Sequence, residues 1–159
     1  MIERASTATP VADPRAPGAA PAAAPARPRA LVVDDYTSSA EALGEHLTGW
    51  GYDARVAHSG EQALGLLDDF EPDLVISDLI MPGISGIELM EKVRSRGIDC
   101  EVLLLTGQGT IETAVDAIRR GAYDYLAKPI DPQRLRHLLE RALERLDGRC
   151  ELFRLRRVL

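Results

Sequence analysis

Short apolar runs alternate with longer amphipathic segments along most of this chain. Five runs have the length and apolar character of buried strands, and they lie at residues 30–34, 54–57, 73–77, 101–105 and 123–127. Between and after them, apolar residues recur three and four positions apart, which predicts helices at residues 37–49, 59–70, 86–96, 110–120 and from 131 onward. Strands that are apolar throughout are typical of a parallel sheet covered on both faces. The pattern therefore predicts an α/β fold, a doubly wound five-stranded parallel sheet flanked by five helices.

The two ends of the chain lack this alternation. Residues 1–29 contain ten Ala and six Pro, and they hold too few large apolar side chains to offset the entropy of ordering, so we expect a disordered tail. Residues 30–146 form the expected domain, and residues 147–159 are expected to form a helical extension or a linker. Apolar residues at alternating spacings of four and three favour a coiled-coil dimer through this last helix, although Gly148 interrupts them; they are Leu139, Leu143, Leu146, Cys150 and Phe153.

Composition and charge narrow the classes of function. The chain has 159 residues and a net charge of −6, and residues 30–139 hold nine Lys and Arg against 19 Asp and Glu. An acidic body of this kind does not attract nucleic acid by itself. No apolar run approaches the roughly 18 residues of a membrane span. Cys100 and Cys150 match neither a metal-binding nor a disulfide pattern, so we expect a core thiol, a tail thiol and a reducing, cytoplasmic setting.

Polar side chains stand where the predicted strands end. Asp34 and Asp35 follow the first strand, Asp78 the third, Thr106 the fourth and Lys128 the fifth. The carboxyl ends of parallel strands meet at one edge of the sheet, where such folds bind ligands.

Three carboxylates gathered at that edge need compensation, because two unit charges about 4 Å apart repel by about 4 kcal/mol at an effective dielectric near 20. A hard cation such as Mg²⁺ removes this cost. One carboxylate could then act as a nucleophile toward a phosphoryl group, while Lys128 neutralises charge on that group and Thr106 donates a hydrogen bond to one of its oxygens.

Four stretches around these residues resemble a known family. They are Val32-Val33-Asp34-Asp35, Asp78-Leu79-Ile80-Met81-Pro82-Gly83-Ile84-Ser85-Gly86, Leu105-Thr106-Gly107 and Tyr125-Leu126-Ala127-Lys128-Pro129. Together they resemble a response regulator receiver domain of bacterial two-component signalling, over about residues 30–146. The resemblance implies a flavodoxin-like receiver fold. It also implies a phosphoacceptor that catalyses its own phosphorylation and dephosphorylation, and is not otherwise an enzyme.

The resemblance further implies how the acidic residues act. Asp78 is expected to accept a phosphoryl group from the phosphohistidine of a histidine kinase. Mg²⁺ is expected to be ligated by Asp35, Asp78 and the backbone carbonyl of Ile80, with Asp34 acting directly or through water.

Lys128 is expected to pair with the phosphoryl oxygens, and its peptide bond to Pro129 is expected to be cis. The resemblance also implies a switch, in which Thr106 moves toward the phosphoryl oxygen and Tyr125 swings into the space that this leaves. The surface made by the helix at 110–120, the fifth strand and the last helix is thereby reshaped.

Ile80 and Gln108 are expected to flank the phosphoryl group. The bulk of Ile80 can exclude water there, and we therefore hypothesise a long-lived phosphoaspartate.

Residues 106–131 are similar to receivers of the nitrogen-regulation type, which precede an ATPase that activates the alternative sigma factor and a DNA-binding domain. This sequence holds no Gly-rich phosphate loop ending in Lys-Ser or Lys-Thr, and no helix-turn-helix pattern. Two interpretations stay open: a fragment whose missing output domains control transcription, and a stand-alone regulator that acts by protein contact.

The expected partners are a cognate histidine kinase, which would contact the first helix near Ser39 and His46, and any output domains. A second copy is also expected, bound through the last helix or the switch surface. Neither a membrane nor direct contact with nucleic acid is expected.

Two rival functions remain. A phosphohydrolase with a nucleophilic Asp after the first strand resembles Asp-x-Asp-x-Thr, whereas Tyr36 stands two residues after Asp34 here. A pseudo-receiver that is never phosphorylated would bind partners only, and the presence of the acidic residues, Thr106 and Lys128 argues against it.

Overall fold

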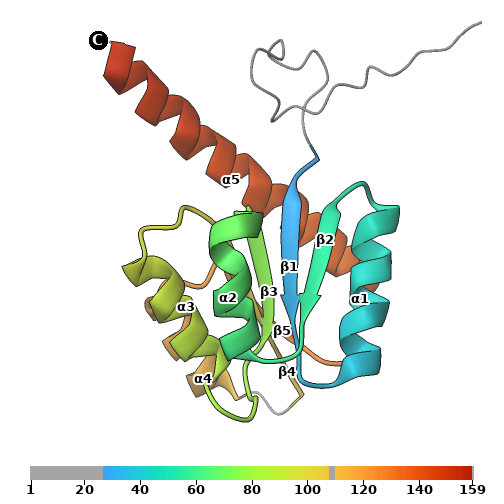
Figure 1. Ribbon diagram of the computed structural model, residues 1–159. Coiled ribbons are helices and arrows are strands. Elements are labelled where there is room, and N and C mark those ends of the chain that lie inside the picture. The colour runs from blue at the N-terminus through green and yellow to red at the C-terminus, as the bar shows by residue number, and fades with distance from the viewer. Residues whose placement is uncertain (1–26, 108–109, 159) are drawn as a thin grey trace, which may run out of the picture.

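The computed structural model describes residues 27–107 and 110–158 of the chain (Figure 1). Ten elements alternate strictly between strand and helix. They are β1 (Arg29–Val33), α1 (Thr37–Gly49), β2 (Asp53–Ala57), α2 (Gly60–Phe70), β3 (Leu74–Asp78), α3 (Gly86–Ser95), β4 (Glu101–Thr106), α4 (Ile111–Arg119), β5 (Asp124–Ala127) and α5 (Pro132–Val158).

The strands form one parallel sheet in the order β2-β1-β3-β4-β5. The predicted doubly wound five-stranded sheet with five helices is therefore confirmed. The chain moves outward from β1 to β2 and then crosses back to β3, so the order reverses between β1 and β3. Ligands of open α/β sheets bind at the carboxyl ends of the strands beside such a reversal.

Two helical layers cover the sheet (Figure 1). Leu31 and Val33 of β1 point into a core shared with α2, α3 and α4. Ala30 and Val32, their neighbours in sequence, point into a second core shared with α1 and α5. Successive side chains of a strand face opposite sides of a sheet, so the uninterrupted apolar run of β1 is what a strand buried on both faces requires.

β1 begins one residue earlier than expected, because Arg29 pairs with the sheet and does not belong to the tail. Its Cα is in register with that of Asp53, and its backbone N–H donates to Oδ2 of Asp73 over 2.8 Å. The N–H of Asp53 in turn donates to the carbonyl of Pro28 at 2.9 Å. Residues 1–26, the rest of the predicted tail, lie outside the described residues.

α5 runs without a break through Gly148 to Val158, so this glycine does not interrupt the helix. Leu139 and Leu146 are buried in the domain, and Leu143 packs partly against the core of the α1 and α5 side. The first part of the predicted coiled-coil seam therefore packs within its own chain. The side chains of Cys150 and Phe153 lie outside the described ones.

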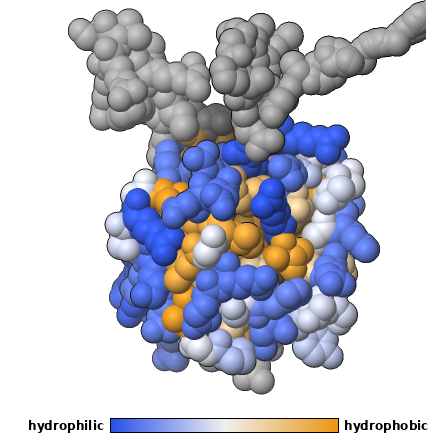
Figure 2. Space-filling model, in the orientation of Figure 1, coloured by the Kyte–Doolittle hydropathy of each residue, from blue (hydrophilic) through white to orange (hydrophobic). Residues whose placement is uncertain are grey.

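The surface seen in Figure 2 is mostly polar, with an apolar strip between α2 and α1 above the sheet. In the described part of the chain, no helix has both the length and the apolar character needed to cross a membrane. Cys100 is a buried free thiol, and burial raises its pKa to about 11, so it stays protonated at neutral pH.

Gly86 lets α3 start directly beneath the end of β3. A Cβ on this residue would lie 2.5 Å from the carbonyl oxygen of Asp78 and 3.0 Å from both Cα of Leu79 and Cδ2 of Leu104. Two of these atoms belong to the backbone and cannot move aside. A side chain at position 86 would therefore push α3 away from the strand end.

We expect Gly86→Ala to lower the free energy of unfolding by about 1–3 kcal/mol through this overlap. Gly65→Ala is the matched control, because a Cβ at Gly65 of α2 meets no atom within 4 Å. That substitution should raise stability by about 0.5–1 kcal/mol, the usual gain of alanine over glycine inside a helix. Urea denaturation of both variants measures the difference, and equal effects would contradict the prediction.

Candidate functional site

Three carboxylates meet at the carboxyl edge of the sheet. Asp34 and Asp35 follow β1, and Asp78 is the last residue of the neighbouring strand β3. One oxygen from each lies within 4.8 Å of the other two. Asp34 is buried, Asp78 is partly buried and Asp35 is exposed, so the cluster is a shallow site open to solvent on the side of Asp35.

Lys128, directly after β5, reaches across the strand ends to two of these acids. Its Nζ donates to Oδ2 of Asp34 over 3.1 Å and lies 3.4 Å from Oδ2 of Asp78. Burial by itself would lower the pKa of Lys128, but the hydrogen bond and charge of Asp34, together with Asp78, outweigh it, so the pKa is raised. The ammonium is therefore fully charged at neutral pH.

Burial raises the pKa of Asp78, and the nearby charge of Asp34 adds to this. Lys128 and a hydrogen bond from the backbone of Leu79 act in the opposite direction without cancelling the effect. A raised pKa means that the ionised carboxylate is less stable in the folded site than in the unfolded chain. A cation bound beside Asp78 would favour its ionised form.

Backbone groups hold the remaining members of the site. The N–H of Tyr36 donates to Oδ1 of Asp34 at 3.0 Å, which orients that carboxylate. Tyr36 is also the N-cap of α1, and its side chain makes no capping bond. Thr106 is 1% exposed at the end of β4, and its carbonyl accepts from the N–H of Lys128 at 2.7 Å.

The donor set fits a hard divalent cation. Carboxylate oxygens are the ligands that Mg²⁺ prefers, and Mg²⁺ keeps several waters, which suits a site open on one side. The close approach of three acids with one ammonium also leaves net negative charge for a cation to neutralise. Asp34, Asp35 and Asp78 are the described side chains that could hold it.

Comparison with known proteins identifies the family of the domain that carries this site. Residues 30–140 match the family described as the response regulator receiver domain. The chain belongs to the response regulator receiver family.

Solved receivers share the fold of this chain. The signal receiver domain of a putative LuxO repressor protein from Vibrio parahaemolyticus superposes with a TM-score of 0.76 at 31% identity, covering 80% of this chain and 98% of that one.

Longer proteins carry similar receivers. The transcriptional regulatory protein ZraR of Salmonella typhimurium is 40% identical over 113 residues, which are 71% of this chain and 26% of that protein. The nitrogen assimilation regulatory protein NtrX of Azorhizobium caulinodans is 36% identical over 130 residues, which are 80% of this chain and 29% of that protein. The similarity to receivers of the nitrogen-regulation type is therefore confirmed, and the chain spans less than a third of the length of these relatives.

The structure places the other predicted receiver residues as follows. The Lys128–Pro129 peptide bond is cis, the isomer that the resemblance implied. Ile80 is 62% exposed just beyond Asp78. Tyr125 is half-buried on β5, and its hydroxyl contacts Thr113 of α4 at 3.2 Å. Gln108 lies outside the described residues.

Sequence reasoning missed Thr113 as a partner of Tyr125. Its only local signal was its place three residues after Thr110, the N-cap of α4, a spacing that indicates a reciprocal cap. The contact with Tyr125 joins a helix to a strand and left no trace in the sequence pattern.

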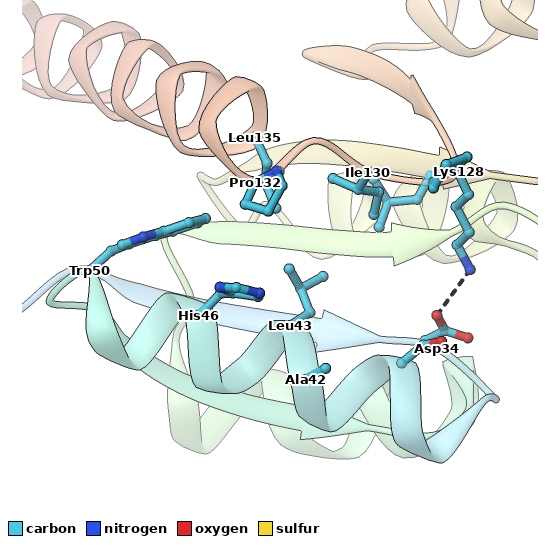
Figure 3. Close-up of a pocket in the computed structure, with 12 residues that line it drawn as sticks. Asp34, Ala42, Leu43, His46, Trp50, Lys128, Ile130, Pro132 and Leu135 are labelled. Carbon is cyan, nitrogen blue, oxygen red and sulfur yellow. Dashed lines mark hydrogen bonds and ion pairs between the residues drawn. The ribbon is translucent and has the colours of Figure 1, made fainter.

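A groove of about 240 Å³ leads away from the receiver site between α1 and the start of α5 (Figure 3). The pair of Lys128 and Asp34 stands at one end, and Trp50 stands at the other. Ser39 and His46, the residues expected to contact a kinase, both line it. The rings of His46 and Trp50 stack with their centroids 5.6 Å apart.

We expect Asp78→Asn to raise the free energy of unfolding by about 0.5–2 kcal/mol in buffer containing a metal chelator, because it removes one of three clustered charges without changing shape. Asp69→Asn on the exposed side of α2 is the control, and should stay within about 0.5 kcal/mol of wild type. Chemical denaturation at pH 7 measures both. A loss of stability in Asp78→Asn would show that the carboxylate stabilises the receiver.

Proposed function

We propose that this receiver takes a phosphoryl group from a histidine kinase onto Asp78 in a reaction that depends on Mg²⁺. The observation that supports this most directly is the placement of Lys128 Nζ within 3.4 Å of Asp78 and 3.1 Å of Asp34 at one strand edge. An ordinary salt bridge pairs one lysine with one acid. Here Lys128 contacts two acids of a cluster of three.

The chemistry follows from the positions of the side chains. An Oδ of Asp78 attacks the phosphorus of the phosphohistidine, and the P–N bond breaks with its electron pair returning to the imidazole nitrogen. Lys128 leaves its contact with Asp78 to pair with a phosphoryl oxygen, and Thr106 donates to another. Mg²⁺, held by Asp34, Asp35, Asp78 and the carbonyl of Ile80, would neutralise charge on the transferring group. The protein thus promotes its own phosphorylation and dephosphorylation.

The groove beside α1 supports a docking place for the kinase. It is lined by apolar side chains and opens onto Lys128 and Asp34 (Figure 3). A helix of the kinase lying along α1 near Ser39 and His46 would bring its phosphohistidine to this edge. A cytoplasmic location is part of the same proposal, and the buried free thiol of Cys100 suits that compartment.

The proposed output runs through the surface of α4, β5 and α5. Ile111, Val115 and Ile118 form an exposed apolar stripe on α4, with 84%, 43% and 45% of each residue exposed. Phosphorylation would reshape this stripe through Thr106 and Tyr125 and so control binding of a second copy or of output domains.

We propose the receiver as residues 30–146, extended by Arg29, with residues 147–159 as a helical connection to such domains. The greater length of the relatives supports a part of a transcription regulator over a stand-alone regulator. The resemblance to receivers of the nitrogen-regulation type suggests an ATPase and a DNA-binding domain as the other parts.

Intact-mass spectrometry after incubation with acetyl phosphate tests the phosphoacceptor. With Mg²⁺ we expect wild type to gain the mass of one phosphoryl group, since Asp78 is the nucleophile. Asp78→Ala should gain none, and chelation of Mg²⁺ should abolish the gain in wild type.

Lys128→Met is the second variant, because it keeps the length of the side chain and removes the charge that neutralises the phosphoryl group. It should slow phosphorylation at least tenfold, a loss of about 1.4 kcal/mol of barrier lowering. Wild type that stays unmodified under all conditions would instead indicate a pseudo-receiver, and steady release of phosphate from monoesters a phosphohydrolase.

The lifetime of the phosphoaspartate tests the proposed role of Ile80. If its side chain adds about 1 kcal/mol to the barrier for attack by water, Ile80→Ala should shorten the half-life about fivefold. Ile80→Leu keeps the bulk and should leave it unchanged. The decay of the phosphorylated mass after removal of the donor measures the half-life, and a wild-type half-life of only seconds would refute the role.

A further inference from the structure

Thr113 contacts both Thr110, the N-cap of α4, and Tyr125 of β5. It lies one turn into α4, three residues after the N-cap Thr110. Its Oγ1 accepts from the backbone N–H of Thr110 at 2.9 Å and lies 2.9 Å from the carbonyl of the same residue. The same oxygen lies 3.2 Å from the hydroxyl oxygen of Tyr125.

The hydrogen-bonding capacity of one hydroxyl limits how these contacts are made. A threonine hydroxyl offers one proton and two acceptor sites. When Thr113 donates its proton to the carbonyl of Thr110 and accepts from the N–H of Thr110, one acceptor site remains. Tyr125 O–H can donate into that site, and the hydroxyl of Thr110, also 3.2 Å from this oxygen, competes for it.

The phenol of Tyr125 is therefore tied to the first turn of α4. Its ring packs against the core formed by α2, α3 and α4, and its backbone is paired with Leu104 of β4. Any turn of the ring that carries the phenol away from α4 breaks the contact with Thr113. Because the same oxygen of Thr113 also caps α4, the contact couples the cap of α4 to the rotamer of Tyr125.

We propose that Thr113 is a positioning residue that holds Tyr125 against α4 and thereby restrains the switch to the phosphorylated conformation. This rests on the proposed function, in which Tyr125 turns inward when Asp78 is phosphorylated. A contact present in one state and absent from the other biases the equilibrium between them. Loss of the contact makes the inward state more populated before any phosphoryl group arrives.

Two single variants and their combination measure the restraint. Tyr125→Phe removes the phenol oxygen and leaves the cap intact, whereas Thr113→Val removes both the bond and the reciprocal cap. A neutral hydrogen bond lost in this way corresponds to an increase of about two- to tenfold in the population of the inward state. We expect each variant to be phosphorylated by acetyl phosphate faster by that factor, and the double variant no faster than Tyr125→Phe.

The first readout needs no phosphorylation. Three-bond couplings in the unmodified protein report the χ1 rotamers of residue 125, and Thr113→Val should move Tyr125 from one dominant rotamer toward averaging. Thr113→Ser keeps the hydroxyl and should match wild type in both measurements. Tyr123→Phe removes the hydroxyl of the neighbouring tyrosine just before β5, whose ring centroid lies 5.7 Å from the Arg145 guanidinium, and serves as the control.

Unchanged rotamers of Tyr125 in Thr113→Val would overturn the proposal, whether or not Asp78 is phosphorylated. So would rate increases that multiply in the double variant, since they would show that the two residues act independently. If the rotamers respond but no variant is ever phosphorylated, the restraint stands and the proposed phosphoacceptor function fails.

Discussion

The repulsion among three carboxylates held within 4.8 Å is the constraint on which the rest of the site depends. Lys128 balances part of it by contacting Asp34 and Asp78 together. Burial, with a smaller contribution from the charge of Asp34, nevertheless raises the pKa of Asp78. A metal ion bound among these carboxylates would stabilise their ionised forms.

Backbone contacts hold the cluster together against this repulsion. The N–H of Tyr36 fixes Asp34, and the N–H of Lys128 bonds to the carbonyl of Thr106 and so sets where the lysine leaves the sheet. Gly86 lets α3 begin against the carbonyl of Asp78. These contacts fix where the chain leaves the strand ends and so keep the acids and the lysine close together.

A second buried acid lies at the opposite edge of the sheet, and arginines balance its charge there. Glu101 opens β4 with only 2% of its side chain exposed, and it lies 3.3 Å from Arg145 of α5 and 3.9 Å from Arg94 of α3. Arg94 also donates to the carbonyls of Cys100 and Gly121. Here two arginines surround one carboxylate, so the group ties α3 and α5 to the sheet. Two arginines thus face one carboxylate here, whereas one lysine contacts two of three clustered carboxylates at the other edge.

Local signals in the sequence sufficed for the type and order of every element, because they act between residues close in the chain. The caps at Ser59 and Thr110 are made by their own side chains, and Gly97 and Gly121 end helices with φ of 73° and 113°. The acids at the strand ends were visible for the same reason. The start of β1 at Arg29 was missed because it depends on pairing with Asp53, far along the chain.

Only the tertiary structure decided which of these residues meet and how closely. Asp34 and Lys128 are 94 residues apart in sequence and bonded in space, and the link between Thr113 and Tyr125 joins different elements. The burial of Leu139 and Leu146 within the domain likewise follows from how α5 lies on the sheet. Periodicity specifies which face of a segment is apolar, whereas distances between segments follow from packing the whole chain at once.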